Sequence, residues 1–179
     1  MFSDVSIQAG AYSTKNLSLY SHAGWELMRA AVEVRGSSDV VIRQCTFRQL
    51  GGAGVSVGTG SRDCTVEACL LDDISGTGII LGGVAGNATQ NATVDALRLS
   101  AVNNHIRDTP AEYHGAVGIF GGYLNSGLIA HNLMERLSYS GVNLGWGWGG
   151  VTPAGIGNTS VANNSILDYC LLLNDCGGM

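Results

Sequence analysis

The stretch "AGVSVGTG", Ala53 to Gly60, alternates apolar residues with small or polar ones and ends in glycine. This pattern predicts a short strand followed by a tight turn. Similar segments recur along the chain in steps of 23 to 38 residues, as "AAVEVRG" (30–36), "TGIILGG" (77–83), "AVGIFGG" (116–122), "SGVNLGWG" (140–147) and "CLLLNDCGG" (170–178).

A second set of apolar segments follows the first set, for example "DVVIRQCTF" (39–47), "DCTVEACLL" (63–71) and "TSVANNSILD" (159–168). Each unit therefore reads as strand, turn, strand, corner and short strand, and a repeated unit of this length is typical of a solenoid. Leucine-rich repeats are excluded because the L-x-x-L-x-L spacing is absent, and helical repeats because no window keeps a helical period. A propeller blade needs about 40 residues. We expect an all-β parallel β-helix with three short strands per coil and about six coils.

Polar and sulfur-containing side chains recur at the predicted corners. Gln44, Asn104, Asn132 and Asn164 are expected to stack from coil to coil and to hydrogen-bond through their amides. Cys45 and Cys69 share one register, so neighbouring coils would bring them within disulfide distance, either as a bonded pair or as free thiols. The five cysteines form no C-x-x-C pair and no histidine completes a zinc site, so we expect neither a metal nor another cofactor.

Composition restricts the possible partners. The 179 residues suit a single domain (1–179), and a net charge of −5 argues against nucleic acid. No apolar run approaches the ~18 residues of a membrane span, so no membrane partner is expected. The N-terminus "MFSDVSIQAG" lacks a signal-peptide pattern.

The longest step between repeats predicts inserted corner loops over residues 84–115. The stretches "VAGNATQNATVDALRLS" (84–100) and "RDTPAEYHG" (107–115) supply the extra length. Insertions in solenoids gather on one face, which is often the binding face. Because neither end carries a recognisable cap, we interpret the chain as a fragment of a longer β-helix that contacts further coils or domains of its own full-length chain.

The segments "YSGVNLGWGWG" (139–149), "AEYHGAVGIFGGY" (111–123) and "NDCGGM" (174–179), with the Asn-x-hydrophobic corners, carry a family resemblance. They resemble right-handed parallel β-helix proteins among the carbohydrate-active enzymes, the nearest being glycoside hydrolase family 141, with fucosidase- and xylanase-like members. The resemblance covers most of the chain from about Ala30 onward. It implies that Asp175 matches a family carboxylate in Asp-x-Gly-Gly. Where the family shows His-Asp before a tyrosine, this chain has Glu135-Arg136, which leaves the second carboxylate unmatched.

Glycoside hydrolysis needs two carboxyl groups, ~5 Å apart in retaining enzymes and ~6.5–9.5 Å apart in inverting ones. Asp175 is the first candidate, with Glu112 in the inserted loop or Glu135 as its partner. The alternative for each is a solvated corner carboxylate. His114, beside Glu112, is a candidate proton shuttle or an ordinary loop histidine.

The glycine-flanked Trp146 and Trp148 offer flat faces on which a sugar could stack, and Tyr139 and Tyr123 could extend that platform. The alternative is that these rings cover the end of an apolar core.

We therefore expect a carbohydrate-active protein that hydrolyses a plant or algal polysaccharide and is located extracellularly or in a periplasm. A non-catalytic glycan-binding or structural module is the second hypothesis. A polysaccharide lyase is the third, disfavoured because only nine Lys and Arg are present and no acidic cluster suits calcium.

Overall fold

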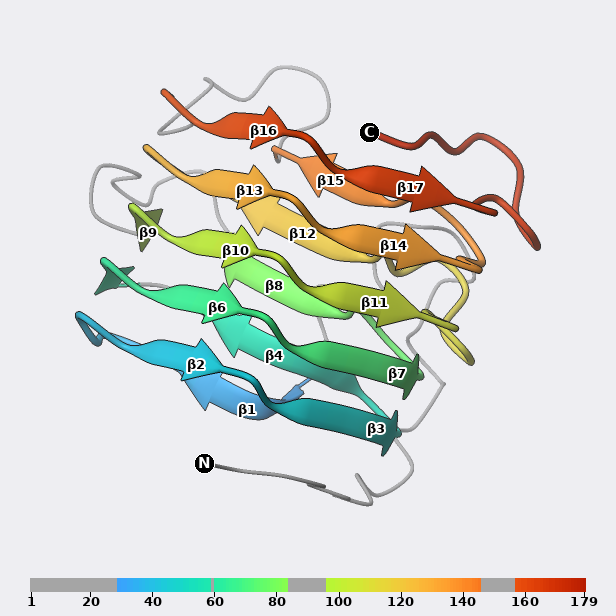
Figure 1. Ribbon diagram of the computed structural model, residues 1–179, viewed down its shortest axis with the longest axis horizontal. Helices are drawn as coiled ribbons and strands as arrows, with labels where there is room; N and C mark the ends of the chain where they lie inside the picture. Colours follow the sequence, from blue (N-terminus) through green and yellow to red (C-terminus); the bar gives the residue numbers. More distant parts are fainter. Residues whose placement is uncertain (1–28, 59, 84–95, 146–156) are drawn as a thin grey trace.

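The computed structural model describes residues 29–58, 60–83, 96–145 and 157–179. These residues form three parallel five-stranded sheets and one small two-stranded sheet, and the strands stack as successive rungs (Figure 1). The first sheet contains β1 (Ala30–Val34), β4 (Ala53–Val57), β8 (Ile79–Gly82), β12 (Ile119–Gly122) and β15 (Val142–Leu144). The second contains β2 (Val41–Arg43), β6 (Thr65–Glu67), β10 (Ser100–Val102), β13 (Leu128–Ala130) and β16 (Ser160–Ala162).

The third sheet contains β3 (Thr46–Leu50), β7 (Leu70–Ile74), β11 (His105–Arg107), β14 (Leu133–Glu135) and β17 (Ser165–Leu167). The small sheet pairs β5 (Ser61–Arg62) with β9 (Ala96–Leu97). Each coil thus contributes one strand to each main sheet, and the strand pairings of the described residues are parallel. The prediction of a parallel β-helix with three short strands per coil is confirmed.

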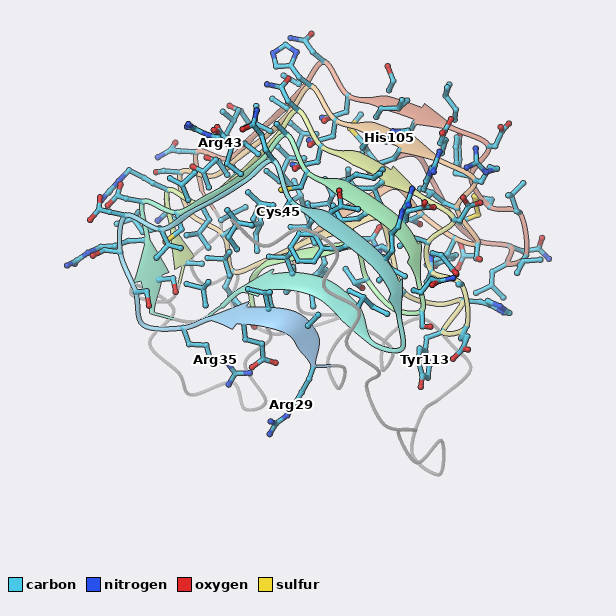
Figure 2. The ribbon with its side chains drawn as sticks, turned by 60° about the horizontal axis from the view of Figure 1, so that its bottom comes forward. Arg29, Arg35, Arg43, Cys45, His105 and Tyr113 are labelled. Carbon is cyan, nitrogen blue, oxygen red and sulfur yellow. A yellow bond between two sulfur atoms is a disulfide. The ribbon has the colours of Figure 1, made fainter. Side chains whose placement is uncertain are left out.

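The core lies between the three main sheets, where the side chains fill the space seen in Figure 2. Register places one apolar side chain from each coil above its equivalent in the next coil. Because strand side chains alternate between faces, every second residue is turned into this core and removed from water. The buried columns include Val55, Ile79 and Ile119 from the first sheet, Val66, Ala101 and Ile129 from the second, and Phe47, Leu71, Ile106 and Met134 from the third.

A column of glycines lies where the chain enters the first sheet. An added Cβ on Gly78 would lie 2.7 Å from the carbonyl oxygen of Gly118, and one on Gly118 would lie 2.8 Å from that of Gly141. Gly141 in turn faces Gly178 at 2.7 Å. Real Cβ contacts are longer, so the repeated glycines are required by the close approach of successive backbones at this position.

A column of asparagines lies between the second and third sheets. The Oδ1 atom of Asn132 accepts hydrogen bonds from the backbone N and the Nδ2 of Asn104, both at 3.0 Å, and Asn164 does the same for Asn132. The predicted amide ladder is therefore present, but Gln44 does not belong to it. The residues that continue this column are Cys69 and Cys45, and the backbone N of Cys69 donates to Asn104.

Both of these cysteines are buried free thiols. Gln44 lies one residue earlier, in the left-handed region at φ 55°.

Two further details of the repeat differ from the sequence-based pattern. Ile79 pairs with Ile119 and not with Val117, so the long step is 40 residues. No strand forms around Leu172, and instead the backbone N of Val142 donates to the carbonyl of Gly178. Within 84–115, residues 96–107 include β9, β10 and β11, while 84–95 lie outside the described residues.

Candidate functional site at the corner between the third and first sheets

The turns that lead from the third sheet to the first form one edge of the solenoid, called here the third corner. Of the turns that follow β7, β14, β11 and β17, two are short, 75–78 and 136–141, and two are long, 108–118 and 168–178. A residue in the left-handed region lies at or just before the start of each, namely Asp73, Arg136, Asp108 and Asp168. The third corner holds four of the predicted site residues, namely Glu112, His114, Tyr139 and Asp175.

Each long turn folds back over the short turn of the preceding coil. In 108–118, the backbone N atoms of Ala111 and Tyr113 donate to the carbonyls of Ile74 and Ser75, both at 2.8 Å. In 168–178, Leu171 and Leu173 donate to Leu137 and Ser138 at 3.1 and 3.2 Å. These bonds satisfy backbone groups and hold both turns against the coil below.

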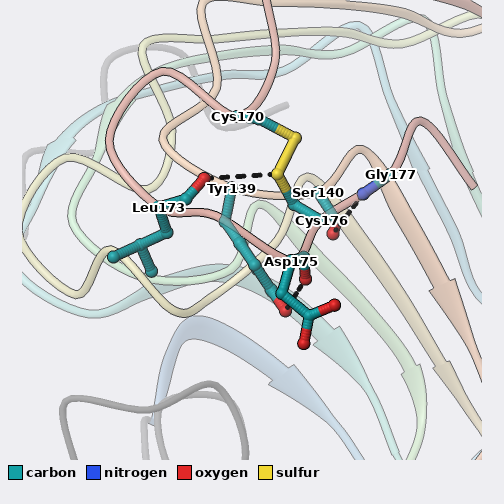
Figure 3. The surroundings of a disulfide bond; sticks show 7 residues. All are labelled: Tyr139, Ser140, Cys170, Leu173, Asp175, Cys176 and Gly177. Atoms are coloured by element: carbon teal, nitrogen blue, oxygen red, sulfur yellow. Dashed lines mark hydrogen bonds between the residues drawn. A yellow bond between two sulfur atoms is a disulfide. The ribbon is translucent and has the colours of Figure 1, made fainter.

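Tyr139 and Asp175 are in direct contact. The Tyr139 hydroxyl donates a hydrogen bond of 2.8 Å to the backbone carbonyl of Asp175 (Figure 3). Asp175 has a φ of 61°, and its exposed carboxyl group extends away from the neighbouring Cys170–Cys176 disulfide. The carboxylate is thus presented to solvent while its backbone is fixed.

Glu112 and His114 lie in the other long turn, two coils before Asp175, and both side chains are exposed. Neighbouring strands lie ~4.8 Å apart, so Glu112 and Asp175 are separated by about 10 Å along the solenoid axis. This axial estimate lies just above the ~6.5–9.5 Å range that separates the carboxyl groups of inverting glycosidases. The His114 ring turns back on its own turn, with Nε2 3.2 Å from the Ala111 carbonyl oxygen.

A small apolar cluster accompanies these turns on the outer side of the first sheet. Tyr113 and Tyr139 are partly buried against Ala53, Ile80, Val117 and Phe120, apart from the main core. Tyr113 lies at the edge of the ribbon in Figure 2. The two tyrosine side chains therefore pack against apolar residues and are also partly exposed to solvent, which suits the stacking of a sugar ring.

Glu135 belongs to a different environment. It lies on β14 and accepts a hydrogen bond from Nε2 of His105 at 2.9 Å, with Arg136 at 3.3 Å. The hydrogen bond to His105, followed by the charge of Arg136, holds the pKa of Glu135 below its usual value. The proposed catalytic role of Glu135 stays a prediction, and its ion pairs make Glu112 the more available partner for Asp175.

The ion pairs of Glu135 continue a charged column on the outer face of the third sheet. Asp72 lies between Arg107 at 2.8 Å and Arg48 at 3.2 Å. Asp108 bonds both to Nε and to Nη2 of Arg136, at 2.8 and 2.7 Å. The hydrogen bonds to these arginines lower the pKa values of Asp72 and Asp108. Each of these carboxylates is paired with an arginine, so we interpret the column as stabilising the fold and not as part of the site.

The predicted aromatic platform is not assembled in the described residues. Tyr123 directly follows β12 and is separated from the third corner by the width of the first sheet. Trp146 and Trp148 lie outside the described residues.

Sequence reasoning missed Tyr113 and the Cys170–Cys176 disulfide. The sequence feature that could have indicated them is the equal length of two segments, "DTPAEYHGAVG" (108–118) and "DYCLLLNDCGG" (168–178), which form the two long turns.

Among the described residues, no group of three His, Cys, Asp or Glu residues is able to hold a metal ion. Nor does this part of the chain contain a helix of the length and apolarity that a membrane crossing requires.

Comparisons with known proteins agree with the architecture. The family model described as "Right handed beta helix region" matches residues 3–94 and 30–178. A solved structure described as "Glycoside hydrolase" is similar with a TM-score of 0.69 and 24% sequence identity, over 83% of this chain. The match covers 26% of that structure, so the chain spans about a quarter of its length. At this identity the likeness shows the fold. Among curated proteins no match was found.

Proposed function

This chain belongs to the right-handed β-helix region family, and we propose that it is a carbohydrate-active member that binds a polysaccharide along the third corner. The observation that carries the proposal is the hydrogen bond from the Tyr139 hydroxyl to the backbone carbonyl of Asp175, which holds a partly buried aromatic ring beside a residue whose carboxylate is exposed. Tyr113, one coil before Tyr139, and Glu112, two coils before Asp175, supply the same two chemical types. An aromatic face with a nearby carboxylate fits the C–H faces and hydroxyl groups of a sugar chain.

We further propose that the site hydrolyses the glycosidic bond by inversion. Asp175 and Glu112 would serve as the carboxylate pair, one protonating the leaving oxygen and the other activating a water molecule. The axial separation of about 10 Å is closer to the ~6.5–9.5 Å of inverting enzymes than to the ~5 Å of retaining ones, which is why inversion is proposed. A plant or algal polysaccharide remains the proposed substrate class. The Cys170–Cys176 disulfide supports an extracellular or periplasmic location, because disulfides persist in oxidising compartments.

The test compares Asp175→Asn and Glu112→Gln with the native chain on xylan, pectin, alginate and fucoidan. Asparagine tolerates the left-handed backbone of Asp175, so the first variant should fold. Asp168→Asn is the matched control, because Asp168 is exposed in the same long turn and shares the left-handed backbone. Reducing-end release and retention in polysaccharide-containing gels are measured for each protein.

The expected result is loss of product release by about 10²–10⁴-fold in both site variants, with unchanged retention and an unaffected control. Retention without product from the native chain would support the non-catalytic glycan-binding alternative. If the native chain neither binds nor cleaves any of the four polysaccharides, the proposed function is wrong.

A further inference from the structure

We propose that the Cys170–Cys176 disulfide is a positioning device for the third corner, and that polysaccharide binding there requires its oxidised form. The requirement for polysaccharide binding rests on the proposed function. The positioning of the turn by the disulfide does not. The disulfide encloses Asp175, whose carbonyl holds the Tyr139 hydroxyl. Cleavage of the S–S bond would therefore release the carboxylate and the ring together.

The two long turns show why a covalent link is needed in only one of them. They have equal length and make equivalent backbone bonds to the coil below, so Pro110 and Ala116 of the first occupy the positions of Cys170 and Cys176 in the second. The first turn is anchored by burial, because Pro110 is buried and Ala116 and Val117 have 0% exposure. In the second turn the equivalent residues, Cys170, Cys176 and Gly177, are only partly buried. The disulfide takes the place of buried apolar contacts.

The segment around Asp175 is otherwise held by hydrogen bonds. The Asp175 carbonyl accepts the Tyr139 hydroxyl at 2.8 Å, and the backbone N of Gly177 donates to Oγ of Ser140 at 3.3 Å. The carbonyls of Gly177 and Gly178 accept from the backbone N atoms of Gly141 and Val142 at 3.3 and 3.0 Å. Asp175 also adopts a left-handed conformation that non-glycine residues visit rarely. Segments with few buried contacts open locally at low free energy. A ring closed between residues six apart removes most of the open conformations of this segment.

The chemistry is selective for this bond. A trialkylphosphine attacks one sulfur and breaks the S–S bond. Water then converts the phosphonium to phosphine oxide, and two thiols are formed, so two electrons pass from phosphorus to the sulfur pair. The cysteines at 45, 64 and 69 are buried and already reduced, so they do not consume reductant.

The experiment places 3-fluorotyrosine at Tyr139 and records its ¹⁹F resonance before and after phosphine treatment. Backbone amide exchange of Leu171 and Gly177 is measured in parallel with retention by the same four polysaccharides. We expect the resonance to move or broaden, the two amides to exchange at least about tenfold faster, and retention to fall about tenfold. Amides of β13 and β14 should keep their rates, since they lie outside the ring.

Two variants control the interpretation. The double variant Cys170→Ser, Cys176→Ser should reproduce the reduced spectrum and no longer respond to phosphine. Cys64→Ala keeps the disulfide and should respond as the native chain does.

The outcomes separate the two proposals. An unchanged ¹⁹F resonance and unchanged exchange after verified reduction would overturn the positioning role, because hydrogen bonds alone would then hold the turn. If the spectrum changes but retention by a polysaccharide that binds the oxidised chain stays the same, the redox requirement for binding is wrong. If no polysaccharide binds either form while the spectrum changes, the proposed function fails and the positioning role stands.

Discussion

The asparagine ladder allows one substitution to be predicted in magnitude. Asn132 is 1% exposed and its side chain takes part in four hydrogen bonds. Its Oδ1 accepts two bonds from Asn104, and its Nδ2 donates to the Ala101 carbonyl at 2.9 Å and to Asn164 at 2.9 Å. Asn132→Ala removes all four bonds and leaves the backbone N–H of Asn104 and one of its two Nδ2–H donors buried without an acceptor, while Nδ2 keeps its bond to the Val66 carbonyl.

An unsatisfied buried polar group costs about 1–3 kcal/mol. The two donors of Asn104 and the bond lost at the Ala101 carbonyl therefore predict a decrease of about 3–6 kcal/mol in the free energy of unfolding. A domain of ordinary stability has ~5–15 kcal/mol in total, so this one substitution should remove a large part of it. Asn164→Ala should cost only about 1 kcal/mol, because Asn164 is less buried and water can replace its lost bonds.

The assay is urea unfolding at constant pH, followed by far-UV circular dichroism. Asn103→Ala is the matched control, because Asn103 is exposed and its side chain is outside the ladder. This control should cost at most about 1 kcal/mol, mainly through its left-handed backbone at φ 56°. If Asn132→Ala destabilises the protein no more than Asn103→Ala, the reasoning that the ladder is held by buried amide pairs is refuted.

Two further predictions concern stability. Gly118→Ala should destabilise the fold by about 1–3 kcal/mol in the same urea assay, because its Cβ would meet the Gly141 carbonyl oxygen at 2.8 Å. Gly157→Ala, whose Cβ would meet nothing closer than 3.8 Å, should change the midpoint little, and equal effects of the two would contradict the close-approach argument. The pKa of Asp72 is lowered in the folded state by Arg107, so its stabilisation is present above the unfolded pKa and is lost as pH falls through the folded value. Arg107→Gln should therefore lower stability at pH 7 and flatten its decline below about pH 5 in an acid titration, and an unchanged slope would argue against this ion pair.

The repeat itself could be recognised from sequence. Alternating apolar residues before glycine give each strand its two faces, and this is a local property of segments such as 53–60. The asparagines at 104, 132 and 164 also carry their spacing in the sequence, which is why the amide ladder was predicted correctly. The register between strands was harder to predict from sequence, because a shift of two residues keeps every side chain on the same face. For this reason Val117 was predicted at the position that Ile119 occupies opposite Ile79.

The site depended on tertiary structure because its parts come from different coils. Only the stacking of coils brings the Tyr139 hydroxyl to the Asp175 carbonyl, across 36 residues of sequence, and places His105 beside Glu135. The disulfide was likewise decided by the path of the turn, since Cys170 and Cys176 meet only when residues 171–175 fold over Ser138. The sequence by itself determined the solenoid, through hydrophobic alternation and glycine at each turn. The tertiary structure alone decided which side chains face one another at the third corner, because coil-to-coil contacts join residues that no local pattern relates.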